Sequence, residues 1–329
     1  MLKIAAFFLC FFVHFAQAQS NMSWAPTKPV RFIIPQVAGG GADAIGRTIA
    51  QALSDKVGQP VIVDNRPGTN GGVGAELLIR SPADGHHLML VFTSMMAINP
   101  AVYERLTYDP LKDLRPLGSV CAVPLVMIAS AKVPANNLGE LIAVLKNNPT
   151  SVFGASSGNG SFSHMMIEII NRKAGVNMTH IPFKGEGPAV QHVLSGQDSI
   201  IYVGTPAIIL SQVQSGRLKA LGVTTSNRMN QIPNIPTLSE GGLSDFNESF
   251  WYGIAATPGV PKNILDAYND AIFDMSKSDS LQASFGKLGN GRTSGSFPCP
   301  DLVVIRRKFN LPFIMTPRQP PVMILCADN

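Results

Sequence analysis

Short apolar runs alternate along the chain with stretches in which apolar residues recur every three or four positions. Val30–Ile34 and His87–Phe92 are almost continuously apolar, which is typical of strands covered on both faces. The stretch Asp43–Val57 between them has the spacing of an amphipathic helix. Because this alternation of strand, turn and helix recurs, it predicts an α/β fold whose sheets are mainly parallel and flanked by helices.

The same reasoning places the remaining elements. Further strands are predicted at Pro60–Val63, Leu117–Cys121, Leu125–Ala129, Ser151–Ala155, Met178–Ile181, Ser199–Val203, Leu218–Thr224 and Phe250–Ala255. Further helices are predicted at Val73–Arg80, Leu138–Asn147, Ser161–Lys173, Pro188–Leu194, Pro206–Ser215 and Pro261–Lys277.

Two positions in this series are interpreted as crossings between lobes. Pro124 splits two neighbouring apolar runs, and Thr225–Arg228 follows the last strand of the second series. The first lobe then comprises residues 19–122 and 228–289, and the second comprises residues 123–227. The length of the chain suits two cores better than one.

The first 18 residues have the three parts of an export signal. Lys3 supplies the charged start, Ile4–Phe15 the apolar centre, and Ala16-Gln17-Ala18 a small-x-small cleavage site. The apolar centre is shorter than the roughly 20 residues that span a bilayer. We therefore expect export to the periplasm, with cleavage after Ala18 leaving 311 of the 329 residues.

The distribution of charge and the spacing of the cysteines argue against two kinds of partner, nucleic acids and metal ions. The formal net charge of +5 is spread along the chain without basic runs, so we expect no nucleic-acid partner. Outside the signal the cysteines are Cys121, Cys299 and Cys326, and no Cys/His spacing suggests a metal. Whether Cys299 and Cys326 form a disulfide stays open.

The first candidate site is the turn Pro35–Arg47, which carries Gly39, Gly40 and Gly41 between a strand and a helix. Glycines let the backbone approach a ligand, and the following helix directs free N–H groups into the turn. Such a cradle suits the carboxylate of a small ligand. Two alternatives remain: a structural tight turn, and a dinucleotide site in which GxGxxA is followed by Asp64.

The second candidate site is Gly154–Ser161, again between a strand and a helix. Ser161 is expected to cap the helix, and the hydroxyl and N–H groups at that helix end can serve a carboxylate. Gly154–Gly158 also matches GxSxG, the nucleophile elbow of serine hydrolases, with Ser156 as nucleophile and His180 or His192 as base. An exported hydrolase is therefore the main competing hypothesis.

A set of ordered motifs runs from about Pro29 to Gly289. They are PQVAGGGADAIGR, VIVDNRPGTNGGVGAE, PADGHHLML, INPAVYERLTYDPLKDLRPLG, GASSGNGSFSH, HIPFKGEGPAVQHVLSGQ, SGRLKALGVTTSNR, IPTLSEGGL and FWYGIAATPGVP. In their order and spacing the chain resembles the Bug-type periplasmic substrate-binding receptors of tripartite tricarboxylate transporters. The resemblance implies a two-lobed Venus flytrap fold that binds a small carboxylate or related polar metabolite between its lobes.

The resemblance further implies a monomer without enzymatic activity or cofactor, which hands its ligand to membrane permease subunits. It assigns the ligand-binding role to matching positions from both lobes. These are Val37, Ala38, Gly39, Gly40, Gly41, Asp43, Ser94, Ser156, Ser157, Gly158, Gly160, Ser161, His164, Lys184, Gly185, Gly204 and Thr205.

The chain departs from the family pattern in three places. Gln36-Val37-Ala38-Gly39 stands where the family usually has Pro or Ala-Pro-Gly-Gly, and Gly204-Thr205 stands where the family often has an acid. The family continues with a strand or turn and a long final helix, and the sequence from Asn290 to Asn329 shows the pattern of neither. We hypothesise that the reading frame changes near Gly289, so that residues 290–329 form an atypical tail.

Overall fold

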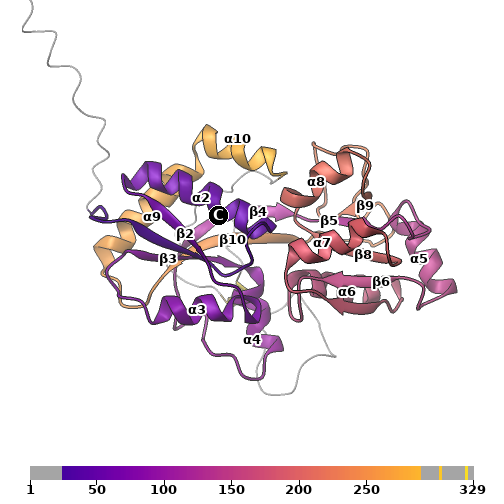
Figure 1. Ribbon diagram of the computed structural model, residues 1–329, viewed down its shortest axis with the longest axis horizontal. Coiled ribbons are helices and arrows are strands. Elements are labelled where there is room, and N and C mark those ends of the chain that lie inside the picture. Colours follow the sequence, from indigo (N-terminus) through magenta and orange to yellow (C-terminus); the bar gives the residue numbers. More distant parts are fainter. Residues whose placement is uncertain (1–23, 290–303, 306–322, 325–329) are drawn as a thin grey trace, which may run out of the picture.

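The computed structural model describes residues 24–289 and two short paired strands, β11 (Val304–Ile305) and β12 (Met323–Ile324). The described chain forms two α/β lobes that lie side by side (Figure 1). The predicted signal and cleavage site, the two C-terminal cysteines and most of the tail lie outside the described residues, so those predictions stay untested.

The sheet of the first lobe has the strand order β2-β1-β3-β10-β4. Its strands are β1 (Val30–Ile34), β2 (Val61–Asn65), β3 (His87–Phe92), β4 (Arg115–Pro124) and β10 (Ser249–Ala256). β1 is parallel to β2 and β3, whereas β10 is antiparallel to β3 and β4. Helices α2 (Gly41–Val57), α9 (Lys262–Ser276) and α10 (Asp279–Lys287) pack together on one face, and α3 (Gly72–Ile79) lies on the other (Figure 1).

The sheet of the second lobe repeats this plan with the order β7-β6-β8-β5-β9. Its strands are β5 (Val126–Ala129), β6 (Phe153–Ser156), β7 (Thr179–Pro182), β8 (Ile200–Gly204) and β9 (Lys219–Val223). β6 is parallel to β7 and β8, and β5 is antiparallel to β8 and β9. The flanking helices are α5 (Leu138–Asn147), α6 (Phe162–Ala174), α7 (Glu186–Ser195) and α8 (Pro206–Gln214).

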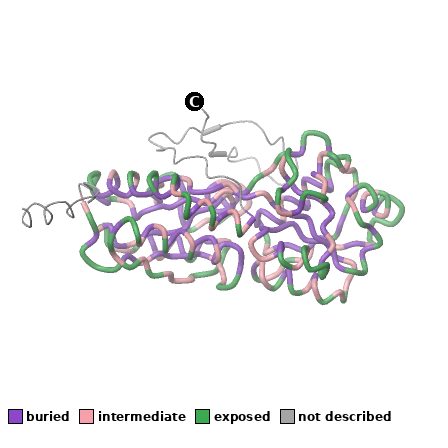
Figure 2. Tube along the Cα trace, turned by 90° about the horizontal axis from the view of Figure 1, so that it is seen from above, coloured by how far each residue is buried: buried purple, intermediate pink, exposed green. Residues whose placement is uncertain are grey.

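Each lobe thus contains one antiparallel crossing strand in an otherwise parallel arrangement. This confirms the two-lobed α/β fold and refines the expected parallel sheets to mixed ones. Strand interiors are buried in both lobes, and exposed residues gather on the outer loops and helix faces (Figure 2). None of the helices in the described part of the chain has the length and hydropathy that a bilayer crossing needs.

Two chain segments connect the lobes next to Thr224. The first passes from β4 through Leu125 into β5. The other segment runs from β9 to β10. It stays with the second lobe as far as Thr237, which forms a parallel β-bridge with Val223. We therefore propose that the return crossing lies near Glu248, about 20 residues later than the sequence-based boundary at residue 228.

Most predicted elements exist within a few residues of their predicted bounds, and the helix Leu138–Asn147 and the strand His87–Phe92 agree in full. Four helical elements were not predicted: the π-helix η2 (Ser94–Ile98), α4 (Asn99–Val102), α10 and the 3-10 helix η1 (Thr69–Gly71). The first two are short turns directly after β3. α10 buries only Leu281 and Phe285, which is too few apolar positions for a clear period.

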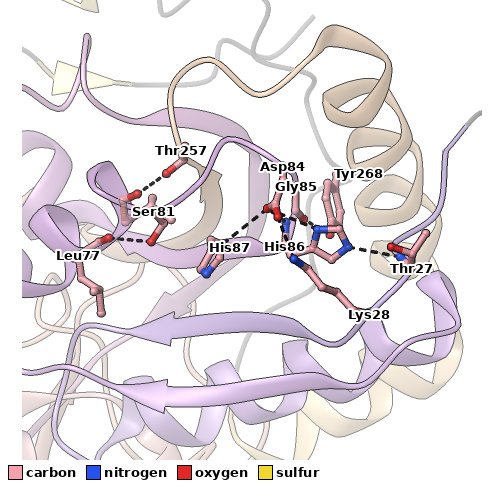
Figure 3. Close-up of polar contacts among 11 residues, drawn as sticks. Thr27, Lys28, Leu77, Ser81, Asp84, Gly85, His86, His87, Thr257 and Tyr268 are labelled. Atoms are coloured by element: carbon pink, nitrogen blue, oxygen red, sulfur yellow. Dashed lines mark hydrogen bonds and ion pairs between the residues drawn. The ribbon is translucent and has the colours of Figure 1, made fainter.

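A polar cluster lies at the amino-terminal end of β3, in the sheet of the first lobe (Figure 3). Asp84 accepts hydrogen bonds from the His86 N–H at 3.0 Å and from Lys28 Nζ at 3.1 Å. Burial alone would raise the pKa of Asp84, but these donors lower it to about 2. Tyr268 on α9 donates to the Gly85 carbonyl at 2.7 Å, so the cluster ties α9 to the loop before β3.

Candidate functional site

A small cavity of about 60 Å³ lies between the lobes, at the carboxyl ends of their parallel strands. Both lobes contribute to it. The residues that line it are Gln36, Val37, Gly40, Gly41, Ala42, Asn70, Phe92, Ser94, Leu125, Ser157, Ser161, Phe162, Ser163, Glu186, Tyr202, Val203, Gly204, Thr205, Phe250 and Tyr252. Aromatic and hydroxyl side chains dominate this set, so the cavity combines apolar walls with neutral hydrogen-bond donors.

The first glycine turn is held in shape by Asp43. Its carboxylate accepts from the Gly39 N–H at 3.0 Å, from Arg47 Nε at 3.0 Å and from Asn65 Nδ2 at 2.9 Å. Burial opposes ionisation, yet these hydrogen bonds lower the pKa of Asp43 below its ordinary value. Gly39 has φ +79°, a conformation that glycine adopts without strain. Asp43 therefore shapes the turn from behind rather than lining the cavity.

The N–H of Gly41, at the start of α2, points across the cleft to Glu186 in the second lobe. It donates to Glu186 Oε2 at 3.0 Å. The N–H of Thr205 donates to Oε1 at 2.6 Å, and the Thr205 hydroxyl lies 2.9–3.0 Å from both carboxylate oxygens. Burial raises the pKa of Glu186 above its ordinary value, although the Thr205 and Gly41 hydrogen bonds act in the opposite direction.

The second predicted turn forms a cluster of serine hydroxyls at the start of α6. Ser163 Oγ accepts from the Ser157 N–H at 2.9 Å and lies 3.1 Å from Ser157 Oγ and 3.0 Å from Ser161 Oγ. Ser161 caps α6, as predicted, by accepting from the His164 N–H at 3.3 Å. Tyr202 on β8 hydrogen-bonds to this cluster through Ser163 and Ser157. The cluster presents neutral hydroxyl donors at a helix N-terminus, which suits a carboxylate.

Ser156 does lie next to a histidine, but the pair lacks the features of a hydrolase. Ser156 Oγ is 2.6 Å from His180 Nε2, while Ser156 is fully buried and is not among the cavity-lining residues. The His180 ring stacks on His164 at 3.8 Å, and among the described residues no carboxylate hydrogen-bonds to it. Burial and the neighbouring His164 lower the pKa of His180 to about 4, which makes it a poor general base near pH 7.

The low pKa of His180 predicts a loss of stability in acid. Since the ordinary pKa is 6.5 and the folded value is about 4, the unfolded chain binds more protons between these values. The free energy of unfolding should therefore fall by about 1–2 kcal/mol as pH drops from 6.5 to 4, allowing for partial solvent exposure. Urea denaturation of the parent and His180→Gln across this range measures it. Equal pH slopes for the two proteins would contradict the prediction.

Further contacts bridge the lobes at the rim of the cavity. Asn70 Nδ2 donates to the Gly160 carbonyl at 3.0 Å, and Tyr103 Oη donates to the Asn159 carbonyl at 2.9 Å. Asn70 has φ +48°, an unusual conformation for a residue other than glycine. Its Nδ2 also donates to Asn99 Oδ1 at 2.7 Å, which holds the side chain toward the second lobe. These contacts show that the lobes are closed upon each other.

The structure brings about half of the predicted site residues to the cavity. Those that line it are Val37, Gly40, Gly41, Ser94, Ser157, Ser161, Gly204 and Thr205. Those that do not line it are Ala38, Gly39, Asp43, Ser156, Gly158, Gly160, His164, Lys184 and Gly185. Several of the latter support the turns: His164 Nδ1 accepts from the Gly160 N–H at 3.2 Å, and a side chain at Gly185 would strike Val37. Lys184 is exposed.

Glu186, Tyr202 and Ser163 were not singled out from the sequence. Glu186 opens a helix, where an acid is ordinary because it complements the helix dipole. Tyr202 lies within a continuously apolar strand, and Ser163 follows an expected cap. The sequence signal that could have pointed to Glu186 is its place directly after Lys184 and Gly185, to which the resemblance assigns a ligand-binding role.

The dinucleotide alternative has little support in the geometry. Asp64, its expected ribose partner, is already paired with Arg31 and Arg66. Pockets for drug-sized ligands are typically several hundred Å³, and this cavity of about 60 Å³ is far smaller. The described residues contain no group of three or more His, Cys, Asp or Glu that could hold a metal ion.

A family model described as the tripartite tricarboxylate transporter family receptor matches residues 45–290. The chain belongs to this receptor family. BugT of Bordetella pertussis is 34% identical to the receptor over 265 residues, which are 80% of this chain and 81% of BugT. The match to the family model ends at residue 290, where the sequence departs from the family pattern. The hypothesis of a changed reading frame stays a prediction.

Solved structures of similar proteins agree with the receptor's fold. An R. palustris protein described with adipate has a TM-score of 0.79 at 28% identity, covering 82% of this receptor and 90% of that chain. MatC from Rhodopseudomonas palustris, described with bound malate, has a TM-score of 0.75 at 26% identity, covering 81% and 90%.

Proposed function

We propose that this receptor captures a small carboxylate in the cavity between its lobes. The observation that carries the proposal is a cavity lined by both lobes, whose lining includes the neutral hydroxyl and N–H donors of the serine cluster at the start of α6. The similar structures with adipate and malate support the same ligand class. The predicted ligand-binding residues that line the cavity are proposed to contact the ligand.

The binding cycle needs closure but no chemistry. In an open form, the ligand carboxylate docks on the hydroxyl and N–H groups at one helix end. Closure then brings the other lobe onto the ligand and expels water, as in other hinged binding proteins. The donors of the serine cluster are neutral, so they bind the carboxylate without a buried cation, and release remains easy when the lobes reopen.

Several further features follow from this proposal rather than from the geometry. The receptor acts as a monomer without enzymatic activity, is located in the periplasm after removal of residues 1–18, and delivers its ligand to membrane permease subunits.

Ser156→Ala separates the receptor from a serine hydrolase: ligand affinity should fall by no more than about tenfold for a lost hydrogen bond, whereas a hydrolase would lose turnover.

A thermal-shift screen of the full chain tests the proposal. The panel contains aliphatic mono- and dicarboxylates, acidic amino acids and aromatic carboxylates, each paired with the corresponding neutral amide. A ligand present at about 100 times its Kd stabilises the folded state by about 2.7 kcal/mol, which should raise Tm by several degrees. At least one carboxylate should do so while its amide does not. A panel in which no carboxylate raises Tm would overturn the proposal.

A further inference from the structure

The N-termini of three helices converge on the Glu186 carboxylate. Gly41 is the first residue of α2 and Thr205 is the N-cap of α8, and each donates its N–H to one carboxylate oxygen. Glu186 itself is the first residue of α7. Each helix end adds positive potential at this point. The first cradle, which the sequence predicts for a ligand carboxylate, is thus already filled by a carboxylate of the protein.

All partners of the Glu186 carboxylate can donate to it. Two are backbone N–H groups, and the Thr205 hydroxyl contacts both oxygens. Tyr202 adds a further side-chain hydrogen bond. Within the described part of the chain, Glu186 is also the one formally charged residue among those that line the cavity. The cavity therefore has an anionic side at Glu186 and a neutral, hydroxyl-rich side at the serine cluster.

We propose that Glu186 is the specificity-determining residue that makes this receptor select monocarboxylates over dicarboxylates, a proposal that rests on the proposed function. The ligand carboxylate binds at the serine cluster formed by Ser157, Ser161 and Ser163, and the uncharged end of the ligand faces Glu186. A second ligand carboxylate would compete with Glu186 for the same donors. In a cavity of about 60 Å³ that Glu186 itself lines, the two anions would also be close to each other.

The strength of this selection follows from the distance between like charges. At about 4 Å and the intermediate screening typical of protein surfaces, repulsion of this kind changes affinity by orders of magnitude. A dicarboxylate could avoid this repulsion only by displacing Glu186 from its hydrogen bonds with Gly41, Thr205 and Tyr202. We therefore expect a monocarboxylate to bind at least about tenfold more tightly than the dicarboxylate of the same carbon skeleton.

Isothermal titration calorimetry with matched acids tests the inference on the full chain. The probes are butyrate and succinate, hexanoate and adipate, and benzoate and terephthalate. In the parent protein the monocarboxylate of each pair that binds should be preferred about tenfold or more. Glu186→Ala removes the internal anion and leaves its donors free, so the preference should disappear or reverse. Glu168→Ala is the control, because it removes an equal charge from the same lobe outside the cavity and should leave the preference unchanged.

The possible results are distinguishable. If some of these acids bind but the parent protein favours the dicarboxylates, or if Glu186→Ala leaves the ratio unchanged, the inference about Glu186 is wrong and the carboxylate receptor stands. If none of the six acids binds, the inference about Glu186 fails, whereas the proposed function fails only if no carboxylate of the thermal-shift panel binds either. Should Glu186→Ala not fold, Glu186→Gln and the preference of the parent protein decide the question.

Discussion

Replacing Gly41 with alanine is expected to weaken ligand binding by about 100-fold or more. A Cβ atom at this position would collide with the Thr205 hydroxyl and would lie 2.6 Å from Glu186 Oε2. Both neighbours belong to the second lobe, so the collision occurs only when the lobes close. Gly41 lies within α2, where alanine is a better helix former than glycine. The variant should therefore fold normally and remain open.

Gly286→Ala is the matched control for this experiment. Gly286 lies in α10 of the same lobe, outside the cavity lining, and a Cβ atom there would meet nothing within 4 Å. Titration of the best carboxylate from the thermal-shift screen should give a Kd within about threefold of the parent protein. Small-angle scattering should show ligand-induced compaction for Gly286→Ala but not for Gly41→Ala. Similar affinities for the two variants would contradict the closure geometry.

The sequence carries enough information for the architecture because the strands are covered on both faces. Runs such as Val30–Ile34 are continuously apolar, and each is followed by a turn and a helical period, so the elements and the two lobes could be predicted. The antiparallel strands β5 and β10 were not distinguished, because the direction of a strand leaves no mark in its hydrophobic pattern. The later position that we propose for the return crossing depends on the pairing of Thr237 with Val223, an isolated contact without a sequence signal.

The candidate site was predictable where backbone conformation determines it. Glycine-rich turns before helices mark anion cradles, and both turns do reach the interlobe cavity through Gly41 and Ser161. The occupant of the first cradle was not predictable. Glu186 lies 145 residues from Gly41 in the chain, and only closure of the lobes brings its carboxylate to that N–H. Contacts between lobes of this kind depend on tertiary geometry that local patterns do not encode.

Replacing Thr224 with valine is expected to destabilise the fold by about 2–3 kcal/mol. Thr224 is fully buried where the chain passes between the lobes, and its side chain serves both connecting segments. Its hydroxyl accepts from the Leu125 N–H at 3.0 Å and donates to the Glu248 carbonyl at 2.7 Å. Valine keeps the shape, but it leaves the buried Leu125 N–H without this acceptor and removes one hydrogen bond to the Glu248 carbonyl. A buried polar group that loses its partner costs more than a hydrogen bond contributes.

Thr224→Ser retains the hydroxyl and removes one methyl group, so it should cost only about 1 kcal/mol. Urea denaturation of the three proteins measures the difference, and equal losses for valine and serine would show that packing rather than hydrogen bonding determines the effect. The backbone of Thr224 also pairs with both segments, through its N–H to the Leu125 carbonyl and its carbonyl to the Glu248 N–H. Since these backbone bonds remain in either variant, the two segments that connect the lobes should keep their backbone course. The loss of stability should then come only from the Thr224 hydroxyl, which bonds to both segments.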